Sequence, residues 1–503
     1  MHGKRACLVA DLRAGNDVVK IPDLIAVLDA AGWKTDISLK EYGGESLKLA
    51  EKAAKDGYDL VIGYGGDGTL NDVVNGVMFA GGKSIIGDIP GGTFNEWAGE
   101  IDLPGDAMKA ALDLVNSYVC DVDLGFFEVE GLTLPAHNGA NGSDADEQGE
   151  EVHEKPKKAG KRRQYFLLHA GLGADAAIMA HINKPLKYHV GPLAFDLSGI
   201  KELPQQRPFP VEIRALNDSG NAEMLWQGDA WQLIVNNTRR YAGSIDISPD
   251  AYLDDGLIDV TVITSGGGLT TIQEAVDYLL LRKVDKNATQ SFRGAHLSIS
   301  VPATILMELD GSVVKLDDYL RKGERKALQQ AQDASTVMVH YRFDAVPASV
   351  RMAIPRSYDG AMFEKPAHKK QFEKAARQHR QDEEKIAELE HRQSEQHSQQ
   401  EQPLSSQKVE ALQKQGQTVR VAGVGLDPNQ KDAFIIAGTY QHKNDDKLEP
   451  AVVCVDQHTL VLNQQGEQVA PLLVETLPEG KPINVEGKRN KRGVIHADYV
   501  MMP

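Results

Sequence analysis

The stretch Asp59-Leu-Val-Ile-Gly-Tyr-Gly-Gly-Asp-Gly-Thr-Leu-Asn71 joins an apolar strand, a glycine-rich turn and the start of a helix. From Leu70 to Met78, apolar residues recur with the spacing of a helix that buries one face. Thr69 is expected to be the N-cap of this helix, with Asp72 three residues later. Glycines let a backbone approach a phosphate closely, and a helix N-terminus offers free N–H groups. The stretch therefore predicts a phosphate-binding turn.

A second turn of the same kind follows. Ile85–Ile89 is predicted as a strand, Pro90-Gly-Gly-Thr93 as its turn, and residues 94–101 as the next helix. Thr93 and Glu96 have the spacing of a capping box. Ligands of open parallel sheets bind at the carboxyl ends of the strands, so we expect the two turns to converge on one polyphosphate.

Asp67 distinguishes this turn from other glycine-rich turns. The residues from Gly63 to Gly68 also satisfy G-x-G-x-x-G, so a dinucleotide-binding Rossmann turn and a purely structural turn are alternatives. A carboxylate inside the turn would repel a bare pyrophosphate, but it becomes favourable when Mg²⁺ bridges it to the phosphates. The sequence therefore favours a nucleoside triphosphate that binds with Mg²⁺.

The composition indicates an ordinary globular protein of two to three domains. The chain has 503 residues, 41% of them hydrophobic, and a formal net charge of −17. This charge argues against a dedicated nucleic-acid-binding protein, so a nucleic-acid partner is not expected. Three widely spaced cysteines predict no disulfide framework and favour a reducing cytoplasm. No stretch is long and apolar enough to predict a transmembrane anchor.

The predicted pattern of helices and strands changes along the chain. Residues 1–125 alternate strand and helix patterns, which predicts a doubly wound α/β domain with a mostly parallel sheet. Residues 126–345 are predicted as a β-rich substrate domain, and strand 346–356 returns to the first domain. Residues 364–417 form a charged linker or helix. Six short strands within 418–503 predict a small all-β barrel, of which the OB type is one form.

Two further segments carry local predictions. Leu269–Val284 is predicted as a helix with a leucine-rich face. The basic residues of 155–163 end a polar loop, and they either touch anionic headgroups or belong to a charge-balanced insertion.

The two glycine-rich turns carry a specific resemblance. Gly65-Gly-Asp-Gly-Thr69 resembles the GGDGT motif of diacylglycerol kinases, sphingosine kinases, NAD kinases and phosphofructokinases. Pro90-Gly-Gly-Thr-Phe-Asn95 resembles the P-x-G-T-x-N element of the diacylglycerol-kinase branch. With the later motifs, the chain is similar to the bacterial soluble lipid kinases of that branch over about residues 5–356. The resemblance implies transfer of the γ-phosphoryl group of ATP to the hydroxyl of a diacylglycerol, a sphingoid base or phosphatidylglycerol.

The resemblance also assigns residues to roles. Asp67 would position Mg²⁺ and act in catalysis. The residues implied in nucleotide binding are Gly65, Gly66, Asp67, Gly68, Thr69, Asn71, Gly92, Thr93 and Asn95. A structural Mg²⁺ would be held by the Asp255 carboxylate and the carbonyls of Tyr252 and Leu257. A surface Asp-Asp-Gly turn without metal is the alternative for this last site.

Glu308-Leu-Asp-Gly-Ser312 resembles the D-G-E element in which the family's general base lies, commonly at the acidic third residue. Here that place is taken by Ser312, whose hydroxyl is not an effective base near neutral pH. Asp310 is therefore the candidate catalytic base, with Glu308 second.

Two further departures concern the nucleotide. Asp11-Leu-Arg-Ala-Gly15 replaces the family's N-P-x-x-G turn, and Lys40 replaces a threonine, so Arg13 or Lys40 is expected to compensate the charge of Asp11.

Two other functions remain open. A soluble-metabolite kinase of the NAD-kinase type is disfavoured by Pro90–Asn95, and a catalytically weak nucleotide- or lipid-binding homologue is favoured by Ser312. For a lipid kinase, we expect a cytoplasmic protein in peripheral contact with the inner membrane face.

Overall fold

The computed structural model describes residues 4–11, 21–40, 44–135, 163–174, 176–177, 207–217, 222–241, 245–264, 288–395, 404, 406–441 and 448–503. The chain forms two compact units. The first contains Met1–Cys120, Arg351–Ala361 and Pro366–Pro503, and the second contains Asp121–Val350 and Met362–Lys365. The helix predicted over Leu269–Val284, residues 155–162 of the basic loop, and Arg13 lie outside the described residues.

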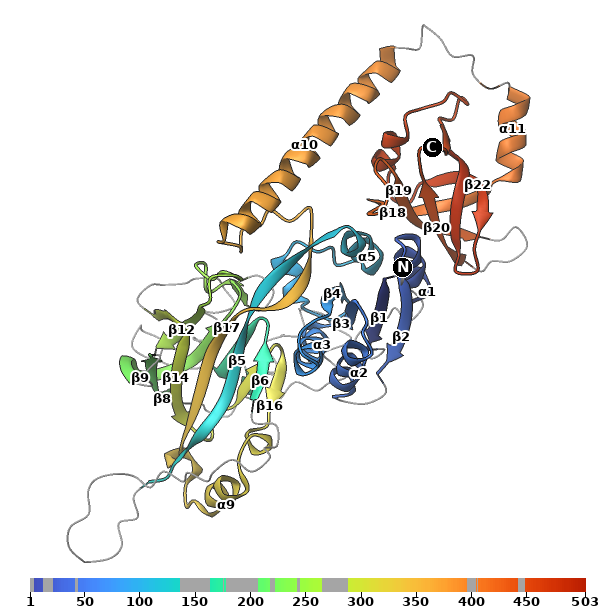
Figure 1. Ribbon diagram of the computed structural model, residues 1–503. Helices are drawn as coiled ribbons and strands as arrows, with labels where there is room; N and C mark the ends of the chain where they lie inside the picture. Colours follow the sequence, from blue (N-terminus) through green and yellow to red (C-terminus); the bar gives the residue numbers. More distant parts are fainter. Residues whose placement is uncertain are drawn as a thin grey trace, which may run out of the picture. The chain divides into compact units, whose positions relative to one another are not determined.

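The first unit contains a parallel sheet with helices on both faces. Its strands are β1 (Arg5–Ala10), β2 (Lys34–Leu39), β3 (Leu60–Gly65) and β4 (Ile85–Pro90), in the order β2-β1-β3-β4. Helices α1 (Ile21–Ala30) and α5 (Ala107–Val115) pack on one face, and α2 (Glu45–Lys55) and α3 (Asp67–Phe79) lie on the other (Figure 1). Arg351 and Met352, near the end of β17 (Met338–Pro355), extend the sheet by pairing parallel to β4. The predicted doubly wound α/β sheet is confirmed.

The second unit is antiparallel and rich in strands. Its elements are β6 (Arg163–Phe166), β7 (His169–Gly173), β8 (Phe209–Leu216), β9 (Ala222–Asn236), β10 (Arg240–Tyr241), β11 (Ile245–Asp246), β12 (Ile258–Thr264), β13 (Thr289–Gly294), β14 (His296–Pro302), β15 (Met307–Leu309), β16 (Ser312–Val314) and α9 (Lys322–Gln330). Two long strands, β5 (Ser117–Thr133) and β17, contribute residues to both units. The predicted β-rich character is confirmed.

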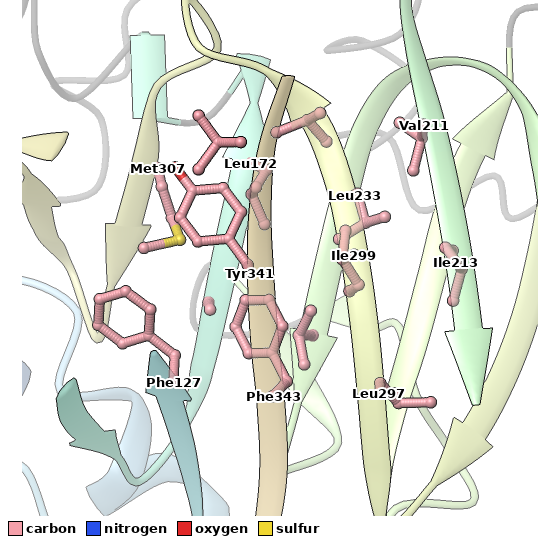
Figure 2. Packing of buried hydrophobic residues seen from close by; sticks show 14 of the residues in the cluster. Phe127, Leu172, Val211, Ile213, Leu233, Leu297, Ile299, Met307, Tyr341 and Phe343 are labelled. Carbon is pink, nitrogen blue, oxygen red and sulfur yellow. The ribbon is translucent and has the colours of Figure 1, made fainter. Parts of the chain in front are cut away.

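The core of the second unit is formed by side chains that point to one side of these strands. Figure 2 shows the rings of Phe127, Tyr341 and Phe343 packed beside aliphatic residues of β7, β8, β9 and β14. The ring centroids of Phe127 and Phe343 are 6.3 Å apart. Large aromatic side chains bury much apolar area, so this cluster stabilises the pairing of β5 with β17.

Residues 418–503, the last part of the first unit, form a small barrel. Its strands are β18 (Gln417–Leu426), β19 (Phe434–Gln441), β20 (Leu448–Val455), β21 (Leu460–Leu462), β22 (Pro482–Arg489) and β23 (Val494–Met501). They pair in the order β20-β19-β18-β22-β23-β21, and a parallel pairing of β20 with β23 closes the barrel. The predicted all-β barrel is confirmed, and its closure over five strands agrees with the OB type.

The barrel shares a hydrophobic core with the parallel sheet. Alternate residues of β19 point to opposite sides: Phe434 and Ile436 face the barrel interior, whereas Ile435 and Ala437 pack with α1 and α5. A hydrogen bond also joins the barrel to the segment after α1, since Asn429 Nδ2 donates to the Ala31 carbonyl at 2.7 Å. Packing on both sides of β19 makes the barrel and the sheet one compact unit.

Residues 364–417, predicted as a charged linker or helix, contain two helices in the structure. They are α10 (Pro366–Glu395) and α11 (Ser406–Gln415). Phe372 of α10 is buried, and its ring lies 6.0 Å from that of Tyr118. Ile386 and Leu389 pack against the barrel core. Sparse apolar residues therefore anchor a helix that is otherwise charged. None of the helices described is long and apolar enough to cross a membrane.

The shared core predicts that a change in the barrel weakens the parallel sheet as well. Ile435 is 0% exposed, so Ile435→Ala should lower the free energy of unfolding by about 2–5 kcal/mol. Urea denaturation measures the loss, and hydrogen exchange of peptides from α1 and α5 should accelerate with it. The matched control is Ile37→Ala, at a side chain 43% exposed in the same unit. Unchanged exchange in α1 and α5 would show that the barrel folds independently.

Candidate active site

The two glycine-rich turns of the first unit lie against each other. The Gly91 N–H donates to the Gly65 carbonyl at 2.8 Å. A Cβ atom placed on Gly92 would overlap the Cα atom of Gly66, and one on Gly65 would lie 2.6 Å from Thr69 Oγ1. Because β3 and β4 are parallel neighbours, their carboxyl ends bring both turns to one edge of the sheet. The turns form a backbone cradle that only glycine allows.

Both helix starts differ from the sequence prediction. Helix α3 begins at Asp67 after an extended Gly66, whose carbonyl accepts the N–H groups of Thr69 and Leu70. Thr69 as N-cap is therefore wrong, because its side chain is buried against Gly65 inside the first turn.

The capping box of Thr93 with Glu96 is also wrong. Helix α4 (Glu96–Glu100) follows Asn95, which adopts a left-handed conformation with φ of 50°. The Asn95 side chain bonds to Gly92 instead: its Oδ1 accepts from the Gly92 N–H at 2.8 Å, and its Nδ2 donates to the Gly92 carbonyl at 3.1 Å.

Asp67 connects the two turns. Its Oδ1 accepts a hydrogen bond of 3.2 Å from the Trp97 N–H at the start of α4. Among the residues predicted to bind nucleotide, Gly66, Asp67, Gly68, Gly92, Thr93 and Asn95 are partly exposed, whereas Gly65, Thr69 and Asn71 are buried. The Asn71 Oδ1 accepts from Asn75 Nδ2 at 3.1 Å, which fixes this side chain inside the helix packing. The binding roles of these residues stay predictions.

Asp88 is a carboxyl group that the sequence reasoning missed. It pairs with Gly63 in the parallel sheet and so lies on the same face, which α3 covers. Burial, and then the negative charge of Asp67, raise the pKa of Asp88 well above its ordinary value. The signal in the sequence is an acid within an otherwise apolar strand, Ile-Ile-Gly-Asp-Ile-Pro.

Asp11 and Lys40 form an ion pair at the ends of neighbouring strands. Lys40 Nζ lies 2.6 Å from Asp11 Oδ2, and both side chains are mostly buried. The Asp11 N–H also donates to the Tyr64 carbonyl at the end of β3. The expectation that Lys40 compensates the charge of Asp11 is confirmed. The pair places a matched anion and cation at the edge of the sheet that carries the glycine turns.

Asp310, the candidate base, lies in the second unit and is only 1% exposed. Its carboxylate accepts three backbone N–H groups, from Leu167 at 2.8 Å and from Leu168 and His169 at 3.0 Å. The residue adopts φ of 42° in the turn between β15 and β16. This geometry ties the turn to the junction of β6 and β7, and it makes Asp310 a rigid anchor.

Glu308 and Ser312 flank that turn differently. Glu308 is fully buried, with its Oε1 3.2 Å from His169 Nε2 and its Oε2 accepting from the Gly311 N–H at 2.8 Å. Ser312 is exposed. Ser312, at the position where the resemblance places the family's acidic residue, is thus open to solvent. The two acids of this turn, Glu308 and Asp310, are buried.

Asn237 is a second polar residue that the sequence reasoning missed. Its Nδ2 donates to the carbonyls of Leu167 at 2.9 Å and Asp123 at 3.0 Å, and its N–H donates to the Leu168 carbonyl at 2.8 Å. Asp310 binds the N–H groups of the same two leucines. The leucine pair is therefore held through both its donors and its acceptors, which orders the backbone beside Asp310.

The residues predicted to hold a structural Mg²⁺ are placed around a tight turn. The Asp255 Oδ1 accepts from the Leu257 N–H at 2.9 Å, and its Oδ2 lies 3.1 Å from Arg293 Nη2. The ring of Tyr252 lies under the Arg239 guanidinium, 4.8 Å from its centroid. Burial raises the pKa of Asp255 to about 6. Among the described residues, no cluster of three His, Cys, Asp or Glu side chains is arranged to hold a metal ion.

The raised pKa of Asp88 predicts a pH dependence. An acid whose pKa in the folded state lies above its ordinary 3.8 keeps its proton when the unfolded chain has lost it. The free energy of unfolding should therefore fall as the pH rises above that value. In Asp88→Asn this part of the fall should vanish, so the difference between pH 5 and pH 8, measured by urea denaturation, becomes smaller. Asp56→Asn, at an exposed position, is the control, and equal pH dependence in both variants would contradict the assignment.

Two family models match the chain. Residues 5–127 match the diacylglycerol kinase catalytic domain, and residues 169–316 match the YegS C-terminal NAD kinase beta sandwich-like domain. Both matches end before α10 and the barrel.

Relatives with known names agree with these matches. The diacylglycerol kinase of Bacillus subtilis (strain 168) is 26% identical over 311 residues, which cover 61% of this chain and 89% of that protein. The diacylglycerol kinase of Staphylococcus epidermidis (strain ATCC 35984) is 29% identical over 262 residues, covering 52% of this chain and 70% of that protein. A crystal structure assigned to the diacylglycerol kinases, from Bacillus anthracis str. Sterne, has 20% identity and a TM-score of 0.50, covers 72% of this chain and 97% of that one, and supports the fold. The chain belongs to the diacylglycerol-kinase-like family of lipid kinases.

Proposed function

We propose that the chain transfers the γ-phosphoryl group of ATP to the hydroxyl of a lipid of the diacylglycerol type. The observation that carries the proposal is the cradle of Gly65, Gly66 and Gly92, with the Asp67 carboxylate at the start of α3. The relatives named diacylglycerol kinase support the choice of a lipid acceptor. Sphingoid bases and phosphatidylglycerol are further members of the same substrate class.

The cradle has the features of a triphosphate site. A side chain at Gly92 would collide with Gly66, so glycine is required there to bring the two turn backbones together. N–H groups at the start of α3 offer hydrogen bonds and a partial positive charge to phosphate oxygens. An anion beside phosphates requires a cation between them, and the Asp67 carboxylate suits Mg²⁺, which when bound would neutralise charge on the phosphates. We therefore assign Asp67 to the metal and the turn backbones to the phosphates.

The acceptor hydroxyl loses a proton in this reaction. In our proposal the Glu308–Asp310 turn supplies the group that accepts this proton. Asp310 is the first candidate, and three backbone N–H groups fix the orientation of its carboxylate. Phosphoryl transfer tolerates a weak base, because positioning and charge neutralisation supply most of the acceleration. A lipid substrate implies peripheral contact with the cytoplasmic face of a membrane.

A kinase assay tests the proposal directly. Mixed micelles that contain diacylglycerol, labelled ATP and Mg²⁺ should yield labelled phosphatidic acid. Asp67→Asn should lower turnover by about 10²-fold or more, because it removes a charge that acts on the transferring group. Asp56→Asn, an exposed acid of the same unit, should keep the activity of the wild type. Labelling of NAD in a parallel reaction, with none in the lipid, would establish an NAD-kinase activity instead.

One observation favours a catalytically weak homologue as a second candidate. Ser312 is exposed, whereas Glu308 and Asp310 are 0% and 1% exposed and bound to groups of the protein. If the proton acceptor is limiting, Ser312→Glu should raise turnover by about 10²-fold, the usual contribution of a positioned general base. Val313→Glu adds the same charge at the next position, which is 38% exposed, and should have no such effect. Unchanged turnover in Ser312→Glu would remove the case for a weak homologue.

A further inference from the structure

The acidic turn before β12 is held by groups of the protein itself. Asp254 is fully buried and accepts the N–H groups of Glu364 at 2.6 Å and Lys365 at 3.0 Å. From the other side, the Asp123 carboxylate accepts the N–H groups of Gly256 and Ala348, each at 2.6 Å. All these residues belong to the second unit. The turn is therefore ordered by charge-assisted hydrogen bonds to backbone N–H groups.

The Arg293 guanidinium contacts the other oxygen atoms around this turn. Arg293 Nη2 lies 3.1 Å from Asp255 Oδ2, 3.0 Å from Asp259 Oδ2 and 2.8 Å from the Asp250 carbonyl. Strand pairing explains this position, because Asp259 of β12 and Arg293 of β13 are direct partners across the antiparallel pair. The guanidinium thus gathers three oxygen atoms that surround the turn.

These contacts do not fit a magnesium ion. Mg²⁺ needs octahedral oxygen ligands at about 2.0–2.1 Å and keeps several waters. Here one oxygen of Asp255 already accepts the Leu257 N–H, and the other faces the guanidinium. A divalent cation at that second oxygen would meet a fixed positive charge at close range.

We infer that Arg293 is the resident cation of this turn and that the second unit folds without a structural divalent metal. This inference is independent of the proposed kinase activity, whose metal is assigned to Asp67 of the first unit and binds with nucleotide. One nitrogen, Nη2, makes all three contacts, so its two N–H groups are shared among the oxygen atoms of Asp250, Asp255 and Asp259.

The inference is tested on the full chain without nucleotide, by thermal unfolding. The Tm of the wild type should be the same in EDTA and in millimolar Mg²⁺. Arg293→Gln should lower the Tm by about 2–4 °C or more, as expected for a domain of this size that loses one stabilising ion-pair cluster. The matched control is Arg214→Gln, an arginine of the same unit that is 44% exposed and, within the described part of the chain, forms an ion pair with the single acid Glu212. Its Tm should stay close to that of the wild type.

Two results would overturn the inference. One is a wild-type Tm that falls in EDTA and returns on addition of Mg²⁺, since it would show a structural metal. The other is an Arg293→Gln variant whose Tm equals that of Arg214→Gln. The first measurement needs only the wild type, so it decides the question even if Arg293→Gln does not fold.

Discussion

The contact between Gly66 and Gly92 is the constraint on which the first unit depends. Two backbone turns meet there with no space for a Cβ atom, which is possible because β3 and β4 are parallel and in register. The same contact sets the start of α3 at Asp67 and lets Asn95 fold back on Gly92. The site is thus built from main-chain atoms, and its side chains are those that the turn geometry leaves at its rim.

The sequence predicted what periodicity and glycine placement control. The parallel sheet, the β-rich unit and the barrel follow from such local patterns. The N-caps at Thr69 and Thr93 were wrong because contacts between the two turns, absent from any local pattern, override capping preference. Asp88 and Asn237 were missed for a related reason: the groups that give each its environment, Asp67 for Asp88 and Leu167 for Asn237, are distant from it in the sequence.

Buried acids of the second unit act mainly on the backbone. Asp123, Asp254 and Asp310 each accept at least two main-chain N–H groups, and each joins segments that are distant in the sequence. A carboxylate can hold several donors at once, so such residues fix irregular turns that no sheet pairing orders. In this unit, acidic residues of motifs that sequence comparison associates with catalysis also stabilise the fold. Arg293 extends this use of charge to the surface, where it forms ion pairs with Asp255 and Asp259.

The packing of the barrel bears on its partners. In the OB type, the face formed by the second and third strands binds oligonucleotides and oligosaccharides. Here those strands are β19 and β20, and their outward residues Ile435, Ala437 and Val452 pack with α1 and α5. Nucleic acid on this face would require the shared core to open, at the cost of exposing apolar side chains to water. The barrel therefore packs this face within its own unit, where it supports the helices behind the parallel sheet that carries the glycine turns.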